Sequence, residues 1–452
     1  MTQILNSELS RRSVLQGAAA AGVPAVLSKR KPRRPGGSDR SATDLPFMPA
    51  AQAESLAASI GVVTHLHFTK TVYGQTDRVV DAVTDLGVRH VRNRIGKTDR
   101  LRAGFAELAR RGVNVQGVCG EFGDSQTMFE VFDEVIRSYP DPAAIFSAFE
   151  GINEPNNNGV PWIDETRAQT RALFLQRNAR GLSHIPIVAP ALARVPSGGA
   201  EGRDTEQQSA NLGDLSEYVD FGNIHVYPRG LQPSTDINAF MRYQREVCGD
   251  APIMCTEGGY FTAKKYKGGA FPVSPGAAGT YLPRQIMEHW TRGNERFFVY
   301  SLLDEYDRTQ AYRPSNFGLL EVTSDGPGGT WTPKPHYYSI KNFVKILGDR
   351  GEAHDVGGMN LSVKGIPDLR TALVAKRNGA RYLAMWRDVL CFEPRSRRSV
   401  HTKRKRATVT LPEEHVVKLY HPSQSHKPTD RLGRVSSFTV PVQDELVICK
   451  IR

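Results

Sequence analysis

The feature that most constrains the fold is an alternation of short apolar runs with amphipathic segments, which extends from about residue 56 to residue 347. The runs are rich in β-branched residues and read as strands, whereas the segments between them have helical periodicity. Eight runs qualify as strands: Ile60–His67, His90–Arg94, Val113–Cys119, Ala148–Asn153, Ile187–Ala189, Phe221–Val226, Ile253–Glu257 and Phe297–Leu302. Eight successive βα units predict an α/β fold, a (β/α)8 TIM barrel of parallel strands enclosed by helices.

The sequence changes character after residue 350, where short alternating runs replace the helical segments. Asn378-Gly379 stands between two of these runs and is typical of a tight hairpin turn. We therefore expect a small antiparallel β-sandwich domain after the barrel. The expected limits are 1–53 for a leader and basic linker, 54–348 for the barrel and 349–452 for the β domain.

The leader has the order of a twin-arginine export signal. Ser10-Arg11-Arg12-Ser13-Val14-Leu15-Gln16 precedes a mildly apolar, alanine-rich stretch that ends at Leu27. Ala51-Gln52-Ala53 offers a small-residue pattern of the kind that signal peptidases cut. The sequence thus predicts a bacterial protein that is secreted or extracytoplasmic and has the twin-arginine translocation machinery as a partner.

The net charge of +12 does not predict nucleic-acid binding, because of how the charge is distributed. Residues 1–40 and the run Arg395–Arg406 hold the excess of basic residues, and the rest of the chain is close to neutral. The basic run is expected to be an exposed loop, with contact to an acidic glycan or a cell surface as the alternative. No apolar window is long enough for a membrane span.

Two carboxylates stand at the C-terminal ends of predicted strands, where the chemistry of this barrel takes place. Strand four ends in Asn153-Glu154-Pro155, and strand seven ends in Thr256-Glu257-Gly258. A glycosidase that retains anomeric configuration needs two carboxyl groups about 5 to 5.5 Å apart, one as general acid/base and one as nucleophile. Glu154 is the predicted acid/base, with a pKa raised by burial and nearby negative charge, and Glu257 is the predicted nucleophile.

Further polar residues near these strand ends are candidates for the same site. Arg92 on strand two and Tyr227 after strand six are predicted to donate hydrogen bonds to Glu257, with Arg94 as an alternative to Arg92. Asn153 is a candidate for binding the sugar hydroxyl beside the reacting carbon. His67, on strand one with His65, is expected to pack or to contact sugar rather than bind metal, because alternate strand residues face opposite sides.

The order of these motifs resembles glycoside hydrolase clan A. The motifs are Asn-Glu-Pro after strand four, His-Val-Tyr-Pro after strand six and Thr-Glu-Gly after strand seven. Within the clan, Gly61-Val62-Val63-Thr64-His65-Leu66-His67-Phe68 and Asn316-Phe317-Gly318-Leu319-Leu320 look like family 39 and its bacterial polysaccharide-hydrolase relatives. The resemblance implies a retaining O-glycosyl hydrolase with a carbohydrate substrate, with Glu154 and Glu257 in the roles given above. It also implies that Asn153 contacts the 2-hydroxyl, that Arg92 and Tyr227 orient Glu257, and that His225 lines the subsite.

The end of strand eight departs from the clan. The clan often has a tryptophan there that forms the floor of the sugar site, but this chain reads Tyr300-Ser301-Leu302-Leu303-Asp304-Glu305-Tyr306. Tyr300 or Tyr306 is expected to replace the tryptophan, and Asp304 and Glu305 to bind hydroxyls. Trp162, after strand four, is a further candidate for stacking on sugar, with a structural cap as the alternative.

Two other functions remain open at this point: a barrel that binds glycan without cleaving it, and a metal-dependent hydrolase. The second would need His and Asp ligands clustered at several strand ends, and the sequence shows no such pattern. Neither a cofactor nor a metal is predicted.

A chelator separates the metal-dependent alternative from the predicted two-carboxylate enzyme. If the Glu pair carries the reaction, glycoside hydrolysis is expected to be the same before and after prolonged treatment with EDTA, because no step needs a metal. Turnover that disappears with EDTA and returns on adding a divalent cation would contradict this prediction.

Overall fold

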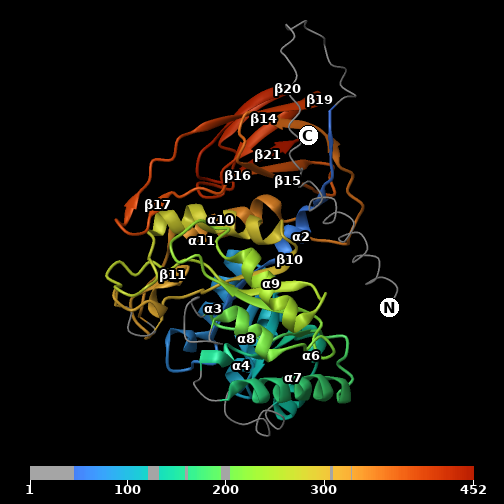
Figure 1. Ribbon diagram of the computed structural model, residues 1–452, viewed down its shortest axis with the longest axis vertical. Coiled ribbons are helices and arrows are strands. Elements are labelled where there is room, and N and C mark those ends of the chain that lie inside the picture. The colour runs from blue at the N-terminus through green and yellow to red at the C-terminus, as the bar shows by residue number, and fades with distance from the viewer. Residues whose placement is uncertain (1–44, 121–131, 158–160, 195–203, 306–308, 327) are drawn as a thin grey trace, which may run out of the picture.

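The computed structural model describes residues 45–120, 132–157, 161–194, 204–305, 309–326 and 328–452. It shows a barrel and an antiparallel sheet domain stacked end to end, with helices α10 (Pro275–Trp290) and α11 (Pro335–Leu347) between them (Figure 1). The proposed export motif at residues 10–16 lies outside the described residues.

The barrel consists of eight parallel strands, as the sequence predicts. In spatial order they are β7 (Ile187–Val188), β6 (Phe146–Ile152), β5 (Asn114–Gly120), β4 (His90–Arg94), β3 (Ile60–Val63), β10 (Asn294–Val299), β9 (Ile253–Gly258) and β8 (Gly222–Val226). A parallel bridge between Val188 and Phe221 joins the two outer strands, so the sheet is nearly closed. The (β/α)8 fold is thereby confirmed.

Amphipathic helices cover the barrel between its strands. They are α2 (Ala53–Ala58), α3 (Thr76–Leu86), α4 (Asp99–Arg110), α6 (Pro142–Ile145), α7 (Trp162–Ala179), α8 (Thr205–Leu212) and α9 (Ile237–Cys248), together with α10 and α11. Local sequence fixes their ends. The side chain of Thr98 accepts a hydrogen bond from the amide of Leu101 at the start of α4, and Gly87 closes α3 with a φ of 86° that favours glycine.

The C-terminal domain is built on a seven-stranded sheet. Its strands are β14 (Ser362–Lys364), β19 (Lys405–Tyr420), β21 (Val447–Ile451), β16 (Arg381–Arg387), β15 (Leu369–Ala375), β2 (Ala51–Gln52) and β20 (Asp430–Val442), which pairs with β19. The predicted turn at Asn378-Gly379 connects β15 and β16, and Gly379 has a φ of 78°. Alternate residues of β16 serve two cores: Tyr382, Ala384 and Trp386 face the barrel, whereas Leu383 and Met385 face a core within the sheet domain.

Two short strands before the barrel belong to the C-terminal domain. β1 (Phe47–Met48) pairs with β13 (Met359–Asn360), and β2 adds a parallel strand beside β15. The flanking residues Ala50 and Ala53 are almost completely buried. The Ala51-Gln52-Ala53 pattern, which we considered for cleavage, is therefore part of the folded sheet, and a cut there would remove two strands.

A buried polar network joins the barrel to the sheet domain through α10. Glu288 is fully buried and accepts a hydrogen bond from the indole of Trp386 at 2.6 Å, and it also pairs with Arg292 and Arg370. Arg284, one turn earlier, donates to the carbonyl oxygens of Arg387 and Val389. Because Glu288 and Arg284 of the barrel helix both bind groups of the sheet domain, the network fixes how the two domains meet.

The first barrel strand is shorter than predicted, and this changes the reading of two histidines. β3 ends at Val63, so His65 and His67 lie in the loop that follows, where side chains no longer alternate between faces. Their rings meet edge to face with centroids 5.7 Å apart. The prediction of a strand through His67 was wrong, and the alternation argument for these two histidines does not apply.

The remaining features of the fold concern membranes and thiols. No helix in the described part of the chain combines the length and apolar character needed to span a bilayer. All five cysteines are buried free thiols.

Replacing Glu288 with alanine tests the interdomain network. The variant leaves Arg370, Arg292 and Trp386 without their shared acceptor, so we expect a loss of about 3 kcal/mol in the free energy of unfolding, measured with urea. Glu413→Ala, at a highly exposed position of β19, is the matched control and should cost less than about 0.5 kcal/mol. Equal losses in the two variants would refute the role of the network.

Candidate active site

Four barrel strands place polar side chains at the same mouth of the barrel. Arg92 comes from β4, Glu150 from β6, His225 from β8 and Glu257 from β9, and Glu154 follows β6 directly. Because these strands are parallel, their C-terminal ends gather at one end of the barrel. The structure therefore brings together residues that are up to 165 positions apart in the sequence.

The Arg92 guanidinium is the centre of the site. It donates to both oxygens of Glu150 at 2.8 and 2.7 Å, to Oε1 of Glu257 at 2.7 Å and to Oδ1 of Asn153 at 2.6 Å. Burial disfavours its charge, but the two carboxylates outweigh that effect and raise the pKa of Arg92. The predicted donation from Arg92 to Glu257 is observed.

Glu150 is a buried carboxylate to which the sequence analysis gave no role. It is fully buried and accepts from Arg92, from Gln116 at 2.7 Å and from Asn223 at 3.0 Å. Burial would raise the pKa of Glu150, but the charge and hydrogen bonds of Arg92 outweigh it, and the pKa lies below its ordinary value. A glutamate inside an otherwise apolar strand, Phe146–Ile152, was the signal that could have identified it.

Both oxygens of Glu257 accept hydrogen bonds from residues on other strands. Arg92 holds Oε1, and the hydroxyl of Tyr227, just beyond β8, donates to Oε2 at 2.5 Å. The side chain is 11% exposed, so it reaches the cleft while most of its surface is covered. The two hydrogen bonds fix the orientation of this carboxylate.

Glu154 adopts an unusual backbone conformation that is maintained by its neighbours. Its φ is 45°, a left-handed value that costs a non-glycine residue about 1 kcal/mol or more. Its amide donates to the carbonyl of Ala191, and Asn157 donates to its Oε2 at 2.9 Å. Its side chain, at 24% exposure, is the more accessible of the two glutamates.

His225 lies between the two glutamates. Its Nδ1 is 2.8 Å from Oε1 of Glu154 and 3.7 Å from Oε2 of Glu257. Its Nε2 is 3.0 Å from the hydroxyl oxygen of Thr256, which itself donates to Oδ1 of Asn223 at 2.7 Å. Since Thr256 uses its only proton on Asn223, it must accept from His225, and Nε2 therefore carries a hydrogen.

The expectation of a raised pKa for Glu154 was wrong. Burial does favour the neutral acid, but the hydrogen bond and charge of His225, with smaller effects from Arg92 and Arg313, lower the pKa overall. The pKa of His225 moves the opposite way: burial lowers it, but Glu257 and Glu154 outweigh burial and raise it. Both shifts describe one proton shared by the pair, which resides mainly on His225.

The two candidate catalytic carboxylates are close enough for a retaining mechanism. One oxygen of Glu154, one oxygen of Glu257 and one nitrogen of His225 all lie within 4.8 Å of one another. Inverting glycosidases separate their carboxyl groups by about 6.5 to 9.5 Å to admit a water molecule. The observed separation fits the shorter spacing of retaining enzymes.

The same three side chains have the donor types of a metal site, but their surroundings disfavour a cation. The Arg92 guanidinium, 2.7 Å from Glu257, already supplies a full positive charge there, and Tyr227 occupies the other oxygen. A divalent ion would have to displace both donors against the repulsion of Arg92.

Aromatic rings border this cluster. Tyr300, after β10, meets Tyr227 with ring centroids 6.1 Å apart and Phe317 at 5.3 Å. Phe317 also contacts Tyr227, at 5.3 Å. Tyr300 therefore stands beside the residue that orients Glu257, where a sugar-stacking ring was predicted, and Tyr306 lies outside the described residues.

The other predicted binding residues have different surroundings. Glu305 is fully buried and holds Nδ1 of His65 at 2.7 Å, so its direct contact with a sugar hydroxyl is not supported. Asp304 is bound to Lys334 and to the amide of Gly318; burial raises its pKa to about 6 although Lys334 opposes the change. These two carboxylates support the mouth of the barrel from within.

His67 and Trp162 complete the predicted set. The pKa of His67 falls to about 3 because of burial and the charges of His65, Arg94 and Arg92, so its ring is neutral near the catalytic cluster. Trp162 begins α7 and packs against the barrel core. Among the described residues no contact joins Trp162 to the glutamates, and its sugar-binding role stays a prediction.

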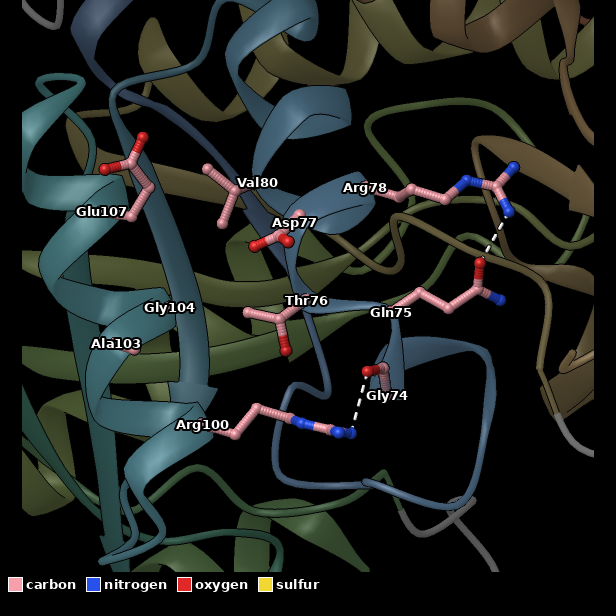
Figure 2. Close-up of a pocket in the computed structure, with 10 residues that line it drawn as sticks. All are labelled: Gly74, Gln75, Thr76, Asp77, Arg78, Val80, Arg100, Ala103, Gly104 and Glu107. Carbon is pink, nitrogen blue, oxygen red and sulfur yellow. Dashed lines mark hydrogen bonds between the residues drawn. The ribbon is translucent and has the colours of Figure 1, made fainter. Parts of the chain in front are cut away.

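A hollow of about 590 Å³ lies apart from this cluster. Figure 2 shows that the loop at Gln75, the first turn of α3 and one side of α4 line it, with Arg78 bonded to Gln75 and Arg100 to Gly74. None of the candidate catalytic residues lines it, so the barrel mouth is the better candidate for catalysis.

Comparison with known proteins shows the fold. No family model matches the chain, and no curated protein matches its sequence. Among solved structures it is similar to a glucosidase from Croceicoccus marinus, with 12% identity, a TM-score of 0.57 and coverage of 91% of this chain and 97% of that one. It is similar also to a monomeric beta-xylosidase from Caulobacter crescentus, with 12% identity, a TM-score of 0.56 and coverage of 90% and 97%. Both likenesses extend over the barrel and the sheet domain.

The opposite pKa shifts of His225 and Glu154 predict a pH window for stability. His225, whose pKa is raised, stabilises the folded state fully at pH values below its ordinary pKa of 6.5. This stabilisation is lost as the pH rises through the raised pKa. Glu154, whose pKa is lowered, stabilises the folded state fully at pH values above its ordinary pKa of 4.5. This stabilisation is lost as the pH falls through the lowered pKa. His225→Gln should therefore cost the most stability between these values, on the order of 2 kcal/mol at about pH 5.5, and less at about pH 9. Urea unfolding of both proteins measures the difference, and a cost that does not change with pH would contradict the shared proton.

Proposed function

We propose that this protein is a retaining glycoside hydrolase that cleaves a polysaccharide or glycoconjugate by double displacement. The observation that carries the proposal is the placement of Glu154 and Glu257 within 4.8 Å at the mouth of a (β/α)8 barrel, with donors on both oxygens of Glu257. The likeness to solved glucosidase and xylosidase structures supports it at the level of the fold. Membership of clan A, and of its family 39, is part of the same proposal.

In the first step the Glu257 carboxylate attacks the anomeric carbon while Glu154 gives a proton to the leaving oxygen. The C–O bond to the leaving group breaks, and an ester forms between the sugar and Glu257. In the second step Glu154 takes a proton from water, which attacks the ester and restores Glu257. Two inversions at the same carbon leave the configuration unchanged.

His225 supplies the proton that Glu154 lacks at rest. The ionised Glu257 is the largest of the influences that raise the pKa of His225. As Glu257 bonds to the anomeric carbon its charge falls, so His225 holds its proton less tightly and passes it across their 2.8 Å contact to Glu154, which delivers it to the leaving oxygen in the same step. Glu154 is then ionised and can take the proton of the attacking water, and this proton returns to His225. Formation of the ester and release of the proton are thus coupled electrostatically.

The proposal assigns two other residues to binding of the reacting sugar. Asn153 is exposed and its amide oxygen accepts from Arg92; its amide nitrogen has no hydrogen bond to the described residues and is assigned to the 2-hydroxyl. Tyr300 offers the ring on which the sugar stacks in place of a tryptophan. The alternative, a barrel that binds glycan without cleaving it, gives no reason for His225 to share a proton with Glu154. Export through the twin-arginine pathway stays part of the proposal.

Hydrolysis of a panel of aryl glycosides by single variants tests the assignment. Glu257→Gln should abolish turnover, because no nucleophile remains to form the ester. Glu154→Gln should lower the rate by roughly 10² to 10⁴ with poor leaving groups and much less with activated aryl groups, which leave without protonation. Tyr300→Ala should mainly raise KM.

The anomer of the first product, followed by NMR, supplies the second measurement. Retained configuration agrees with the proposal, whereas an inverted product contradicts it. Glu413→Ala serves as the control for changes far from the site.

A further inference from the structure

Two separate segments form an exposed basic surface beside the active site. One is the loop after β9, with Lys264, Lys265 and Lys267, and the other is the hairpin of β17 (Phe392–Glu393) and β18 (Arg398–Ser399), with Arg395, Arg397 and Arg398. All six side chains belong to exposed residues. We call these six residues the basic rim.

Hydrogen bonds join the two segments of the rim, so its basic residues are held together by the fold. Arg397 donates to the carbonyl oxygens of Lys264 and Tyr266, which lie more than 130 positions earlier, and so fixes the hairpin against the loop. Figure 1 shows β17 extending from the sheet domain down beside α10 and the barrel loops. The two domains therefore build the rim jointly.

The charge of the rim is not compensated within the described part of the chain. None of its six residues makes an ion pair there, and the one acidic residue of the hairpin strands, Glu393, accepts from the backbone amide of Arg395. A surface that holds this much unpaired positive charge in one place attracts a polyanion.

A largely buried aromatic cluster connects the rim loop to the residue that binds Glu257. Tyr227, which binds Glu257, meets Phe317 at 5.3 Å; Phe317 meets Phe261 at 5.4 Å; and Phe261 meets Tyr266 of the rim loop at 5.3 Å. Phe261 and Phe317 are almost completely buried, so their rings pack the rim loop against the barrel mouth. The cluster thus holds the rim close to the cleft, and a chain of sugars that leaves the cleft on this side meets the rim.

Arg313 adds a positive charge beside this cluster. Its guanidinium lies 5.9 Å from the ring centre of Phe261 and 5.8 Å from that of Phe317, and its charge contributes to the lowered pKa of Glu154. It makes no ion pair with any described residue. Positive charge therefore continues from the rim into the neighbourhood of the acid/base.

We infer that the substrate is an anionic polysaccharide, carrying a uronate carboxylate or a sulfate on its sugars, and that the basic rim holds the part of the chain outside the cleft. This inference rests on the proposed glycosidase function and names its substrate class. The proposed glycosidase cleft selects a carbohydrate, while the rim and Arg313 select negative charge. A phospholipid surface would use the charge of the rim but not its position beside the cleft.

Binding to the full chain carrying Glu257→Gln tests the inference without interference from turnover. The probes are polygalacturonate, dextran sulfate, neutral dextran and phosphatidylglycerol vesicles. We expect one of the two anionic polysaccharides to bind at least about ten-fold tighter than dextran at about 20 mM salt, with the preference reduced at about 300 mM salt. Which of the two binds identifies carboxylate or sulfate.

A matched pair of triple variants locates the charge effect. Lys264→Gln/Lys265→Gln/Lys267→Gln should weaken polyanion binding by about ten-fold, whereas Lys364→Gln/Lys427→Gln/Arg434→Gln, at exposed positions of the sheet domain, should change it less than about two-fold. Equal losses in the two variants, equal binding of anionic and neutral polysaccharide, or rim-dependent binding of vesicles alone would overturn the inference.

The same variants separate this inference from the proposed function. If the Lys264/Lys265/Lys267 variant hydrolyses small aryl glycosides like the wild type but cleaves the polyanion poorly, the rim selects substrate. If the rim binds a polyanion but no glycoside or polysaccharide is cleaved, the glycosidase proposal fails and the rim remains a glycan-binding surface.

Discussion

The site depends on one buried cation. Arg92 binds Glu150, Asn153 and Glu257, so a single guanidinium links the ends of three strands. A buried arginine without these acceptors would be very costly, and the carboxylates without Arg92 would repel each other. Barrel geometry and site geometry therefore depend on the same contacts. The single positive charge of Arg92 is shared between Glu150, which is fully buried, and Glu257, which is partly open to the cleft.

The electrostatic arrangement also determines where the mobile proton sits. Glu154 has a left-handed φ of 45°, which turns its carboxylate toward His225 and Asn157. His225 in turn is oriented by Thr256 and Asn223 beneath it. The acid/base is thus the exposed end of a hydrogen-bonded chain, and its protonation follows the charge on Glu257. A carboxylic acid kept neutral only by burial would not respond to the progress of the reaction in this way.

The sequence predicted the barrel because buried parallel strands carry a pattern that is hard to mistake. It predicted the glutamate pair because strand ends of a barrel converge, so two carboxylates about 100 residues apart, Glu154 and Glu257, could be placed together.

The direction predicted for the pKa of Glu154 was wrong, since the 2.8 Å contact with His225 depends on how the ends of β6 and β8 approach. The first strand was predicted to reach His67 but stops at Val63, and the complete burial of Glu305 at the end of strand eight is not visible in the sequence. The strands at 47–52 were missed because two-residue strands have no periodicity. The basic hairpin was seen only as a charged run, because its contact with Lys264 bridges 133 positions.

The most direct test of the account is to trap the covalent intermediate. A panel of activated 2-deoxy-2-fluoro glycosides, which form the sugar ester quickly and hydrolyse it slowly, is incubated with the protein, and the labelled peptide is identified by mass spectrometry. The account predicts one sugar per chain, attached to Glu257, and no label in the Glu257→Gln variant. A label on another residue, or product formed with inversion and no intermediate, would contradict the assignment of Glu257 as nucleophile.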